Sequence, residues 1–511
     1  MRMRDAAFLG ILIVVFLACV VRDPRSDSLP FRSFHPLPDA IEYAVGAANI
    51  EAGRDLTLEI NGHAIPSRYP FGFPLVIALF YRLLGNDIVN AYCVSIVFGA
   101  ASIPALFMLV RALVPEAGVA CWSAFFFATN SLVLSFAPLV MTELCSVFVA
   151  LLALNLAVRV VPKRGTLGFV ALGVVLGFGI LVRTANVLMI PPIVLYLGWV
   201  HGRQLGARQG LAVLGPLAGA VGLLLLYNTR VFGSPFRDGY ALYTPRTLFA
   251  WRFVAASALP YFRTLALAQG GKTLWLDGPF YSPLVPLLAV VGLATLRGAR
   301  HRCVRGLAVT WIVLFYCFYA SYFFYDFRFF LPVLPVVLLL AACGLGFVLQ
   351  RLGTFPRAIV SVLVIGLYLL QPLSGGWSSL DAARHNRGTR EPPLNYLYVQ
   401  AVNAYMDRIG ARPETHFVLS ALNLVYHDHY SSKRYTILPL SRDQEYARVP
   451  ELAPMIGGPD LDALLAQGRE VYVSDFAADD EATRGAFRAL VASYRLEPVP
   501  VPGITLARLS K

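Results

Sequence analysis

Charged side chains are scarce in this sequence. Asp, Glu, Lys and Arg make up 14% of its 511 residues, whereas a soluble globular domain carries about 25%. Hydrophobic residues make up 57% of the chain, and the mean hydropathy is +0.63. A large core does not account for so great a shortage of charge, so lipid must solvate much of the surface. The composition therefore excludes an ordinary soluble protein and predicts an integral membrane protein.

Cysteine is missing from residues 374–511, and the sequence has no CxxC pair. The seven cysteines lie in or beside hydrophobic segments, where they are expected to pack as small apolar side chains. No Cys/His spacing is typical of a metal site. The sequence thus predicts neither a disulfide framework nor a metal centre, and it indicates no cofactor.

Positive charge is in excess, with a formal net charge of +13, but it is not gathered into a basic stripe. The arginines are scattered through short loops between apolar runs, which excludes nucleic acid as the partner. The bias that keeps positively charged loops on the cytoplasmic side of a membrane explains this pattern.

Long apolar runs fill the chain as far as residue 373. A helix crosses the hydrocarbon core of a bilayer with about 20 apolar residues. We predict about eleven transmembrane helices, at residues 6–21, 88–110, 117–136, 139–158, 166–182, 185–200, 209–227, 283–297, 304–324, 329–350 and 356–373. No small-residue cleavage site follows the first span, which is therefore expected to remain as an anchor.

Basic residues orient these spans. With Arg2 and Arg4 in the cytoplasm, every tight basic cluster falls in a cytoplasmic loop. This requires the short apolar segment 73–84 to lie along the outer interface instead of crossing the bilayer. An odd number of spans then places residues 374–511 outside. We predict an integral protein of a bacterial inner (plasma) membrane with a periplasmic or extracellular C-terminal domain.

The composition changes once, near residue 374, and this divides the chain into two domains. Residues 1–373 form the membrane domain, with large outer loops at 22–87 and 228–282. In residues 374–511, short β-type runs alternate with helical patterns, which favours a small α/β domain. The β-type runs are at 417–420, 435–438, 470–474 and 504–509, and the helical patterns include 460–467 and 479–493. The predicted fold class is a polytopic α-helical membrane protein with a small soluble α/β C-terminal domain.

Two carboxylates follow the first span. Asp39 and Glu42 stand at the start of the helical pattern 40–52. A carboxylate beside the membrane is suited to act as general base on an acceptor hydroxyl or amine. The alternative is structural, with Asp39 as the N-cap of the helix and Glu42 completing a capping box. From the residues alone the capping interpretation is the stronger one.

Glu143 and Arg183 mark the outer ends of two other predicted spans. Ionisable residues at membrane depth are costly and are often functional. Arg183 lies on the side that the orientation bias disfavours, which makes it a candidate ligand for an anion. Its position is explained equally well if the side chain only extends from the membrane to the aqueous surface.

The segment Tyr325-Asp326-Phe327-Arg328 is a further outer turn. Arg328 lies near the start of the next helix, a position that suits a phosphate or diphosphate. A local contact between Asp326 and Arg328 is the competing interpretation. Asn228, at the start of the second large outer loop, is a candidate substrate-binding residue, and turn formation is the alternative interpretation.

His427 and His429 invite a metal interpretation. Two histidines separated by one residue face opposite sides of a strand, and no third ligand is evident in the sequence. We therefore expect a solvated loop at this position.

Five local patterns occur in order along the membrane domain. They are Asp39…Glu42-Tyr43, Arg68-Tyr69-Pro70-Phe71-Gly72-Phe73-Pro74, Pro138-Leu139-Val140-Met141-Thr142-Glu143, Gly177…Leu181-Val182-Arg183-Thr184 and Arg328-Phe329-Phe330-Leu331-Pro332-Val333-Leu334-Pro335. In order and spacing they resemble the GT-C superfamily of polyprenyl-phosphate-sugar-dependent glycosyltransferases. The resemblance covers residues 1–373. It is greatest to the bacterial branch that includes aminoarabinose transferases, protein mannosyltransferases and rhizobial lipopolysaccharide transferases.

The resemblance implies a membrane glycosyltransferase that moves a sugar from a polyprenyl phosphate to an exported lipid, glycan or protein. It implies that Asp39 is the catalytic base. It also implies that arginines of the outer face hold the lipid phosphate, with Arg183 and Arg328 matching best and Arg68 less well. We predict Tyr69, Asn228 and Tyr325 as further substrate-binding residues.

The sequence departs from this family at one position. Many relatives carry an Asp-Glu pair, whereas here Ala40 follows Asp39. We therefore expect Glu42 or Glu143 to serve as the second carboxylate.

Two other functions stay open. A transporter or lipid flippase usually carries charged residues in the middle of its spans, and here the midspan regions are almost wholly apolar. A non-catalytic membrane scaffold would tolerate the loss of Asp39, whereas a transferase that uses Asp39 as its base would not.

Overall fold

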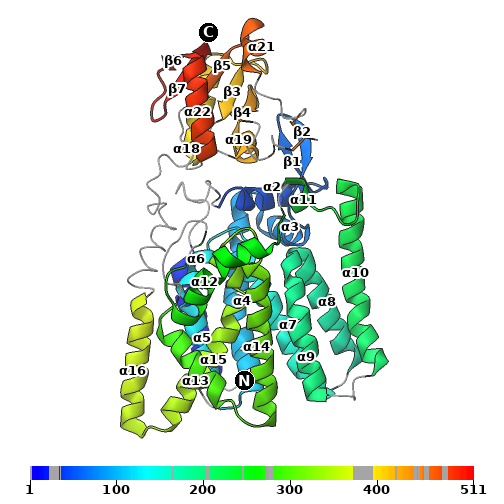
Figure 1. Ribbon diagram of the computed structural model, residues 1–511, viewed down its shortest axis with the longest axis vertical. Coiled ribbons are helices and arrows are strands. Elements are labelled where there is room, and N and C mark those ends of the chain that lie inside the picture. Colours follow the sequence, from blue (N-terminus) through cyan, green and yellow to red (C-terminus); the bar gives the residue numbers. More distant parts are fainter. Residues whose placement is uncertain are drawn as a thin grey trace.

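The chain folds into a helical bundle with a small mixed domain above one end (Figure 1). The computed structural model describes residues 3–21, 34, 36–116, 118–163, 165–201, 206–243, 247–271, 273, 281–371, 395–419, 423–441, 446, 449–450, 452–453, 460–474 and 481–511. The predicted domain boundary at residue 373 lies outside the described residues, between the last helix of the bundle and the first helix of the small domain, and stays a prediction.

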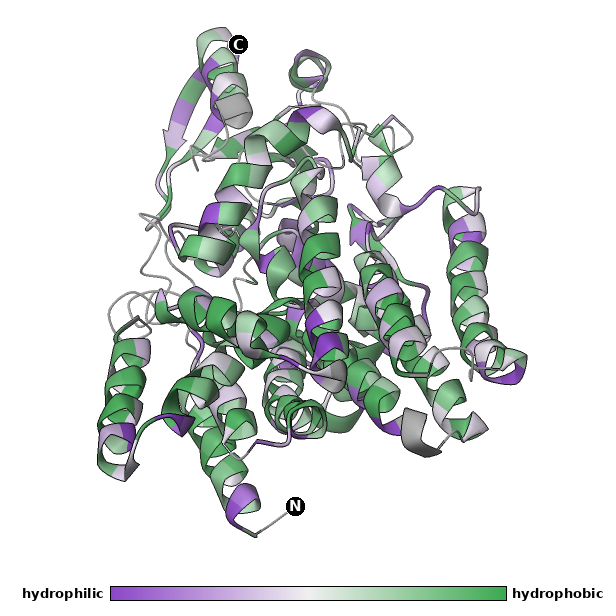
Figure 2. Ribbon diagram, turned by 60° about the horizontal axis from the view of Figure 1, so that its bottom comes forward, coloured by the Kyte–Doolittle hydropathy of each residue, from purple (hydrophilic) through white to green (hydrophobic). Residues whose placement is uncertain are grey.

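The bundle consists of apolar helices that run along the long axis of the molecule. They are α1 Met3–Val20, α4 Tyr92–Leu113, α5 Val119–Ala128, α6 Ser131–Phe136, α7 Glu143–Lys163, α8 Thr166–Val182, α9 Ile190–His201, α10 Ala207–Phe232, α13 Leu284–Thr295, α14 Ala299–Ala320, α15 Leu334–Gln350 and α16 Thr354–Gln371. Figure 2 shows hydrophobic residues along most turns of these helices. Many of them are exposed, as expected where lipid is the solvent.

The predicted spans coincide with these helices, although several are shorter than predicted or interrupted. Among the described residues, four helical segments have the length and apolar composition of a membrane span: Met3–Val20, Ile88–Leu113, Ala207–Phe232 and His301–Ala320. The predicted span 117–136 is two helices, because Asn130 caps α6 with its side chain. The span 185–200 begins as the 3₁₀ helix η2 Thr184–Met189, and 329–350 begins with another, η4 Phe327–Phe330. The number of spans stays a prediction.

Glycines allow the closest helix pairs to form. A Cβ added at Gly292 of α13 would overlap the carbonyl oxygen of Leu340 in α15, and one at Gly344 would overlap the carbonyl oxygen of Leu288. Gly173 of α8 approaches the backbone of α10 at Val213 in the same way. Such small residues let helix backbones approach where lipid removes the hydrophobic driving force for packing.

The outer loops contain more structure than the sequence predicted. The first contains α2 Asp39–Glu51, a hairpin of β1 Thr57–Ile60 and β2 His63–Pro66, α3 Gly72–Leu84 and the 3₁₀ helix η1 Ile88–Ala91. The second contains α11 Gly239–Tyr243 and α12 Trp251–Leu267. The hairpin turn is Asn61-Gly62, with positive φ at both residues, which is a strong sequence signal for a two-residue hairpin. The hairpin was not among the predicted elements.

The helix α3 covers the segment predicted to lie along the outer interface. One side of it is buried, including Phe73, Ile77 and Tyr81, and another exposes Leu75 and Leu79. An amphipathic helix with large exposed apolar residues is suited to the boundary between lipid and water.

The small domain is an α/β unit, as predicted. Its sheet has the order β4-β3-β5-β7-β6, with β3 parallel to β4 and β5, and β7 antiparallel to β5 and β6. The elements are α18 Asn395–Arg408, β3 His416–Leu419, α19 Leu424–Tyr430, β4 Thr436–Pro439, α21 Leu461–Ala466, β5 Val471–Ser474, α22 Glu481–Ser493, β6 Arg495–Val499 and β7 Leu506–Ser510. The strand β6 was not predicted, because most of this edge strand is exposed and it lacks a buried alternation.

The segment that contains His427 and His429 is not a solvated loop, contrary to our prediction. It is the helix α19, and His427 is completely buried. His427 stacks on Phe417 of β3, and its Nε2 lies 2.9 Å from the hydroxyl of Tyr435. His427 therefore belongs to the core of the domain, and no group of metal-binding side chains occurs among the described residues.

Candidate functional site

A cavity of about 530 Å³ lies where the outer loops meet the ends of the bundle helices. Its polar lining comes from segments far apart in the sequence. These residues are Asp39, Tyr43, Arg68, Tyr69, Thr142, Glu143, Arg183, Asp238, Tyr240 and Arg328. The cavity thus gathers six of the nine residues that the sequence predicted for the site: Asp39, Arg68, Tyr69, Glu143, Arg183 and Arg328.

Four of the charged side chains reach the cavity from the ends of helices. Asp39 is the first residue of α2, and Glu143 is the first residue of α7. Arg183 follows the last residue of α8, and Arg328 lies in η4, just before α15. These helix ends meet at the cavity, which brings together residues that are far apart in the sequence.

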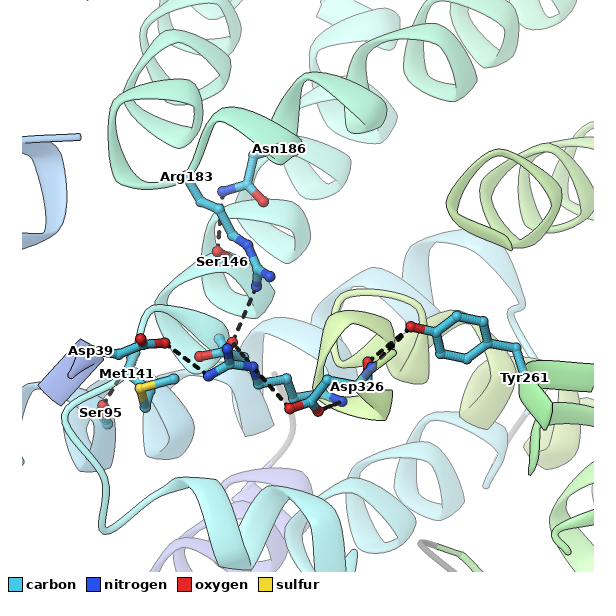
Figure 3. A network of polar contacts seen from close by, with 10 residues as sticks. Asp39, Ser95, Met141, Ser146, Arg183, Asn186, Tyr261 and Asp326 are labelled. Atoms are coloured by element: carbon cyan, nitrogen blue, oxygen red, sulfur yellow. Dashed lines mark hydrogen bonds and ion pairs between the residues drawn. The ribbon is translucent and has the colours of Figure 1, made fainter. Parts of the chain in front are cut away.

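Arg328 is the centre of an ionic network, whose labelled members Asp39, Asp326 and Arg183 point toward one another in Figure 3. Its Nη1 lies 3.0 Å from Oδ2 of Asp39, and its Nε lies 3.3 Å from Asp326 and 3.7 Å from Glu143. The Asp326 carboxylate also accepts a hydrogen bond from the backbone NH of Arg328, at 2.9 Å. The local contact that we had considered for Asp326 and Arg328 therefore exists, and it holds the guanidinium toward the cavity.

Glu143 is shared between two arginines. Its Oε1 lies 3.3 Å from Nη1 of Arg183, in addition to its contact with Arg328. Both guanidinium groups lie over the ring of Phe329, with their carbons 5.1 and 5.3 Å from its centroid. The second oxygen of Glu143, Oε2, is buried and has no hydrogen-bond partner among the described residues. This oxygen is available to accept a hydrogen bond.

Asp39 does not cap α2, contrary to the capping interpretation. The N-cap is Pro38, and no side chain caps this helix. Instead, Oδ1 of Asp39 accepts a hydrogen bond from the hydroxyl of Tyr69, and Oδ2 accepts one from the guanidinium of Arg328. Burial, followed by the charge of Asp39, raises the pKa of Tyr69, so Tyr69 stays protonated and donates its hydrogen. Asp39 is thus a carboxylate held in one orientation at the cavity wall.

Glu42 does not complete a capping box, and it does not line the cavity. It is completely buried one turn after Asp39. Its Oε1 lies 2.8 Å from Nε of Arg68 and accepts a hydrogen bond from the hydroxyl of Tyr446. Glu42 thus contacts Arg68, a residue of the cavity lining, without lining the cavity itself.

Asn228 and Tyr325 also lie outside the cavity lining. The side chain of Asn228 donates to the carbonyl oxygen of Pro235 at 3.2 Å, which agrees with the turn alternative. Tyr325 packs on Tyr261, with ring centroids 4.5 Å apart. The structure therefore gives neither residue a direct place in the site.

Sequence reasoning missed the aromatic wall of the cavity. Phe249, Phe318, Tyr319, Tyr322 and Phe323 line it. The segment 248–250 joins this wall through backbone hydrogen bonds to Ser321 and Phe323. The dense aromatic run 315–330 was a signal, but hydropathy alone assigns it to a span. A wall of large apolar rings beside arginines fits a ligand with both an apolar and an anionic part.

The comparisons with known proteins agree with this architecture. A family model described as dolichyl-phosphate-mannose-protein mannosyltransferase matches residues 68–228. No curated protein is similar enough in sequence to match the chain.

The solved structures that are similar over most of the chain include the following two. ArnT from Cupriavidus metallidurans bound to undecaprenyl phosphate has 14% sequence identity and a TM-score of 0.65, and the match covers 99% of this chain and 97% of ArnT. The archaeal oligosaccharyltransferase AglB from Archaeoglobus fulgidus, in complex with an inhibitory peptide and a dolichol-phosphate, has 12% identity and a TM-score of 0.55. That match covers 92% of this chain and 69% of AglB. The resemblance and the fold class inferred from the sequence are confirmed.

Proposed function

We propose that this chain, which has the fold of the GT-C glycosyltransferases, transfers a sugar from a polyprenyl-phosphate donor to an exported acceptor. The observation that carries the proposal is the cavity that joins Asp39 to Arg183 and Arg328 beside an aromatic wall. The two similar structures hold undecaprenyl phosphate and dolichol-phosphate. We extend that class of lipid to this chain.

The reaction is an inverting displacement at the anomeric carbon. Asp39 takes the proton from the hydroxyl or amine of the acceptor as its oxygen or nitrogen forms the new bond to the sugar. The bond between the anomeric carbon and the phosphate oxygen breaks, and its electron pair leaves with the lipid phosphate. Positive side chains stabilise the charge that develops on this leaving group, and Arg183 and Arg328 are the residues we assign to that role.

The pairing of Arg328 with Asp39 links donor binding to the base. A lipid phosphate that binds Arg328 competes with the carboxylate 3.0 Å away for the same guanidinium. Donor binding therefore weakens the ion pair and releases one oxygen of Asp39 for the acceptor. Tyr69 keeps the carboxylate oriented by holding the other oxygen.

Glu143 is the second carboxylate that the sequence predicted. Its unpartnered Oε2 is suited to accept a hydrogen bond from a hydroxyl or amine of the sugar or the acceptor. The acceptor is an exported lipid, glycan or protein. We place the site at the outer face of a bacterial inner membrane, with the C-terminal domain on the same side.

The test is mass spectrometry of polyprenyl-phosphate lipids from host cells that lack this protein. The cells are complemented with wild type, Asp39→Asn or Asp87→Asn. Asp87 is a matched control, because it only caps η1 and asparagine caps equally well. We expect one glycosylated carrier to accumulate in the null and with Asp39→Asn, and to disappear with wild type and Asp87→Asn. An unchanged lipid pool in all strains would refute the transferase and favour the transporter or scaffold alternatives.

A further inference from the structure

A second polar cluster lies behind the cavity and joins the C-terminal domain to Arg68. Its centre is the carboxylate of Glu42, which is completely buried. Glu42 Oε1 is 2.8 Å from Nε of Arg68, and Glu42 Oε2 is 3.4 Å from the backbone nitrogen of the same residue. The hydroxyl of Tyr446, in the C-terminal domain, donates a hydrogen bond to Glu42 Oε1. One carboxylate therefore connects the two domains.

Three tyrosine rings enclose the guanidinium of Arg68. The guanidinium carbon lies 5.9 Å from the ring centroid of Tyr69, 5.3 Å from that of Tyr243 and 5.4 Å from that of Tyr446. Tyr69 follows β2, Tyr243 is in α11, and Tyr446 is in the C-terminal domain. These contacts restrict the orientation of an arginine that also lines the cavity.

The helix α11 packs directly against the backbone of Arg68 and restricts its position. A Cβ added at Gly239 would overlap the backbone of Arg68, so the two segments are in direct contact. The hydroxyl of Tyr243 donates to the carbonyl oxygen of Pro66 at 2.5 Å. Arg68 thus has a fixed backbone, and its side chain is held by Glu42 and the rings.

The C-terminal domain is anchored next to this cluster by Asn61. Its backbone NH donates to Asp428 at 2.9 Å, its side-chain NH₂ donates to the carbonyl oxygen of Ile437 at 2.7 Å, and its side-chain oxygen accepts from the NH of Ile437 at 2.9 Å. In Figure 1 the hairpin that carries Asn61 lies between the bundle and the C-terminal domain. This anchor fixes the domain where Tyr446 reaches Glu42.

We propose that Tyr446 and Glu42 are positioning residues for Arg68, and that the C-terminal domain thereby completes the site for the lipid phosphate. The proposal rests on the proposed function. It assigns Glu42 a role other than catalytic base, because its carboxylate is enclosed between Arg68 and Tyr446. It also gives residues of the C-terminal domain a part in substrate binding.

The physical reason is that Arg68 binds the phosphate well only when its guanidinium is held in the right orientation. A hydrogen bond to a charged group is lost when the hydroxyl of Tyr446 is removed, and Glu42 then holds the side chain of Arg68 less firmly. The phosphate is present in both the bound substrate and the transition state, so loss of this positioning weakens binding in both. The defect should therefore be one of affinity and not of the chemical step.

The experiment measures binding of undecaprenyl phosphate to the purified full-length chain by native mass spectrometry. The variants are Tyr446→Phe, Arg68→Ala and the double variant. Tyr494→Phe is the matched control, since its hydroxyl bonds Asp462 on the exposed side of the same domain. Melting temperatures check that each variant is folded.

We expect Tyr446→Phe to weaken binding about tenfold and Tyr494→Phe to leave it unchanged. In the Arg68→Ala background, Tyr446→Phe should cause no further loss, because the two residues act as one unit. Equal losses in both backgrounds, or no loss with Tyr446→Phe alone, would overturn the positioning role. If the wild type itself does not bind the lipid, the proposed function fails first, and the role of Tyr446 fails with it.

Discussion

Arg328 shows how one buried residue holds together several segments of the chain. It contacts carboxylates from three places in the sequence, Asp39, Asp326 and Glu143, and its side chain is 9% exposed. A buried charge that loses its partner is strongly destabilising, whereas an exposed ion pair contributes little. The stability of the protein should therefore depend on this residue more than on its surface ion pairs.

The first prediction concerns Arg328→Gln. Removal of the guanidinium leaves the carboxylates of Asp39 and Asp326 without this cation, and we expect a loss of roughly 3–5 kcal/mol of unfolding free energy. The control is Arg111→Gln, which breaks the more exposed pair of Arg111 with Asp5, whose side chains are 45% and 18% exposed. Its expected cost is less than about 1 kcal/mol. Denaturant titration of the detergent-solubilised protein measures both, and equal losses would show that the network is not a source of stability.

The second prediction concerns Asp39→Asn. If phosphate and Asp39 compete for Arg328, the neutral amide removes the competitor. Undecaprenyl phosphate should then bind more tightly, while sugar transfer falls by at least about 100-fold, as for loss of a general base. Lipid binding and lipid turnover measured on the same preparation test this. Weaker lipid binding in this variant would contradict the competition.

At the scale of the element, the pairing of α13 with α15 depends on glycine. The contacts of Gly292 with α15 and of Gly344 with α13 bring these two backbones together. Helix propensity alone would favour alanine at both positions, so the conformation of the single helix does not explain the glycines. Packing does, because no Cβ fits between the helices.

The third prediction is that Gly292→Ala lowers the unfolding free energy by roughly 1–3 kcal/mol, the usual cost of overpacking. Gly366→Ala is the control. It lies in α16, where a Cβ would meet nothing within 4 Å, and a change of less than about 1 kcal/mol is expected there. The same denaturant titration applies, and similar effects at both positions would argue against close packing of α13 on α15.

At the scale of the whole molecule, the stability of the C-terminal domain should depend on pH. Burial, with a smaller effect of Lys433, lowers the pKa of His427 to about 3, and the same causes lower that of His429 to about 4. Tyr435 donates to Asn403, so its oxygen accepts from Nε2 of His427. The other ring nitrogen, Nδ1, is buried and has no hydrogen-bond partner among the described residues. A proton there would be an unpaired buried charge.

The fourth prediction follows from the sign of these shifts. Histidines of the unfolded chain take up protons below about pH 6.5, while these folded ones do not until lower pH. The unfolding free energy is therefore not reduced by them above that pH, and it decreases as the pH falls below it. Near pH 5 these two histidines should contribute a loss of roughly 2.5 kcal/mol per pH unit, and His427→Gln should reduce that contribution to roughly 1.2. Pulse proteolysis of the full chain, followed at its C-terminus, measures the slope. An identical slope in the variant would show that His427 does not contribute.

The sequence by itself determined the membrane character, the positions of the apolar helices, the α/β type of the C-terminal domain and the resemblance to GT-C enzymes. Hydropathy and alternation are local properties, and they survive in any arrangement of the elements. The ends of the helices were less predictable, because caps such as Asn130 divide an apolar run without changing its hydropathy.

Only the tertiary structure decided which partners surround each candidate residue. Asp39 and Glu42 are one turn apart on α2, and the sequence offered both as caps or as bases. Their surroundings differ because Arg328, 289 residues from Asp39, contacts the carboxylate of Asp39. Tyr446, 404 residues from Glu42, contacts that of Glu42. The function of a carboxylate depends on the charges and donors around it, and those come from segments that only the fold brings together.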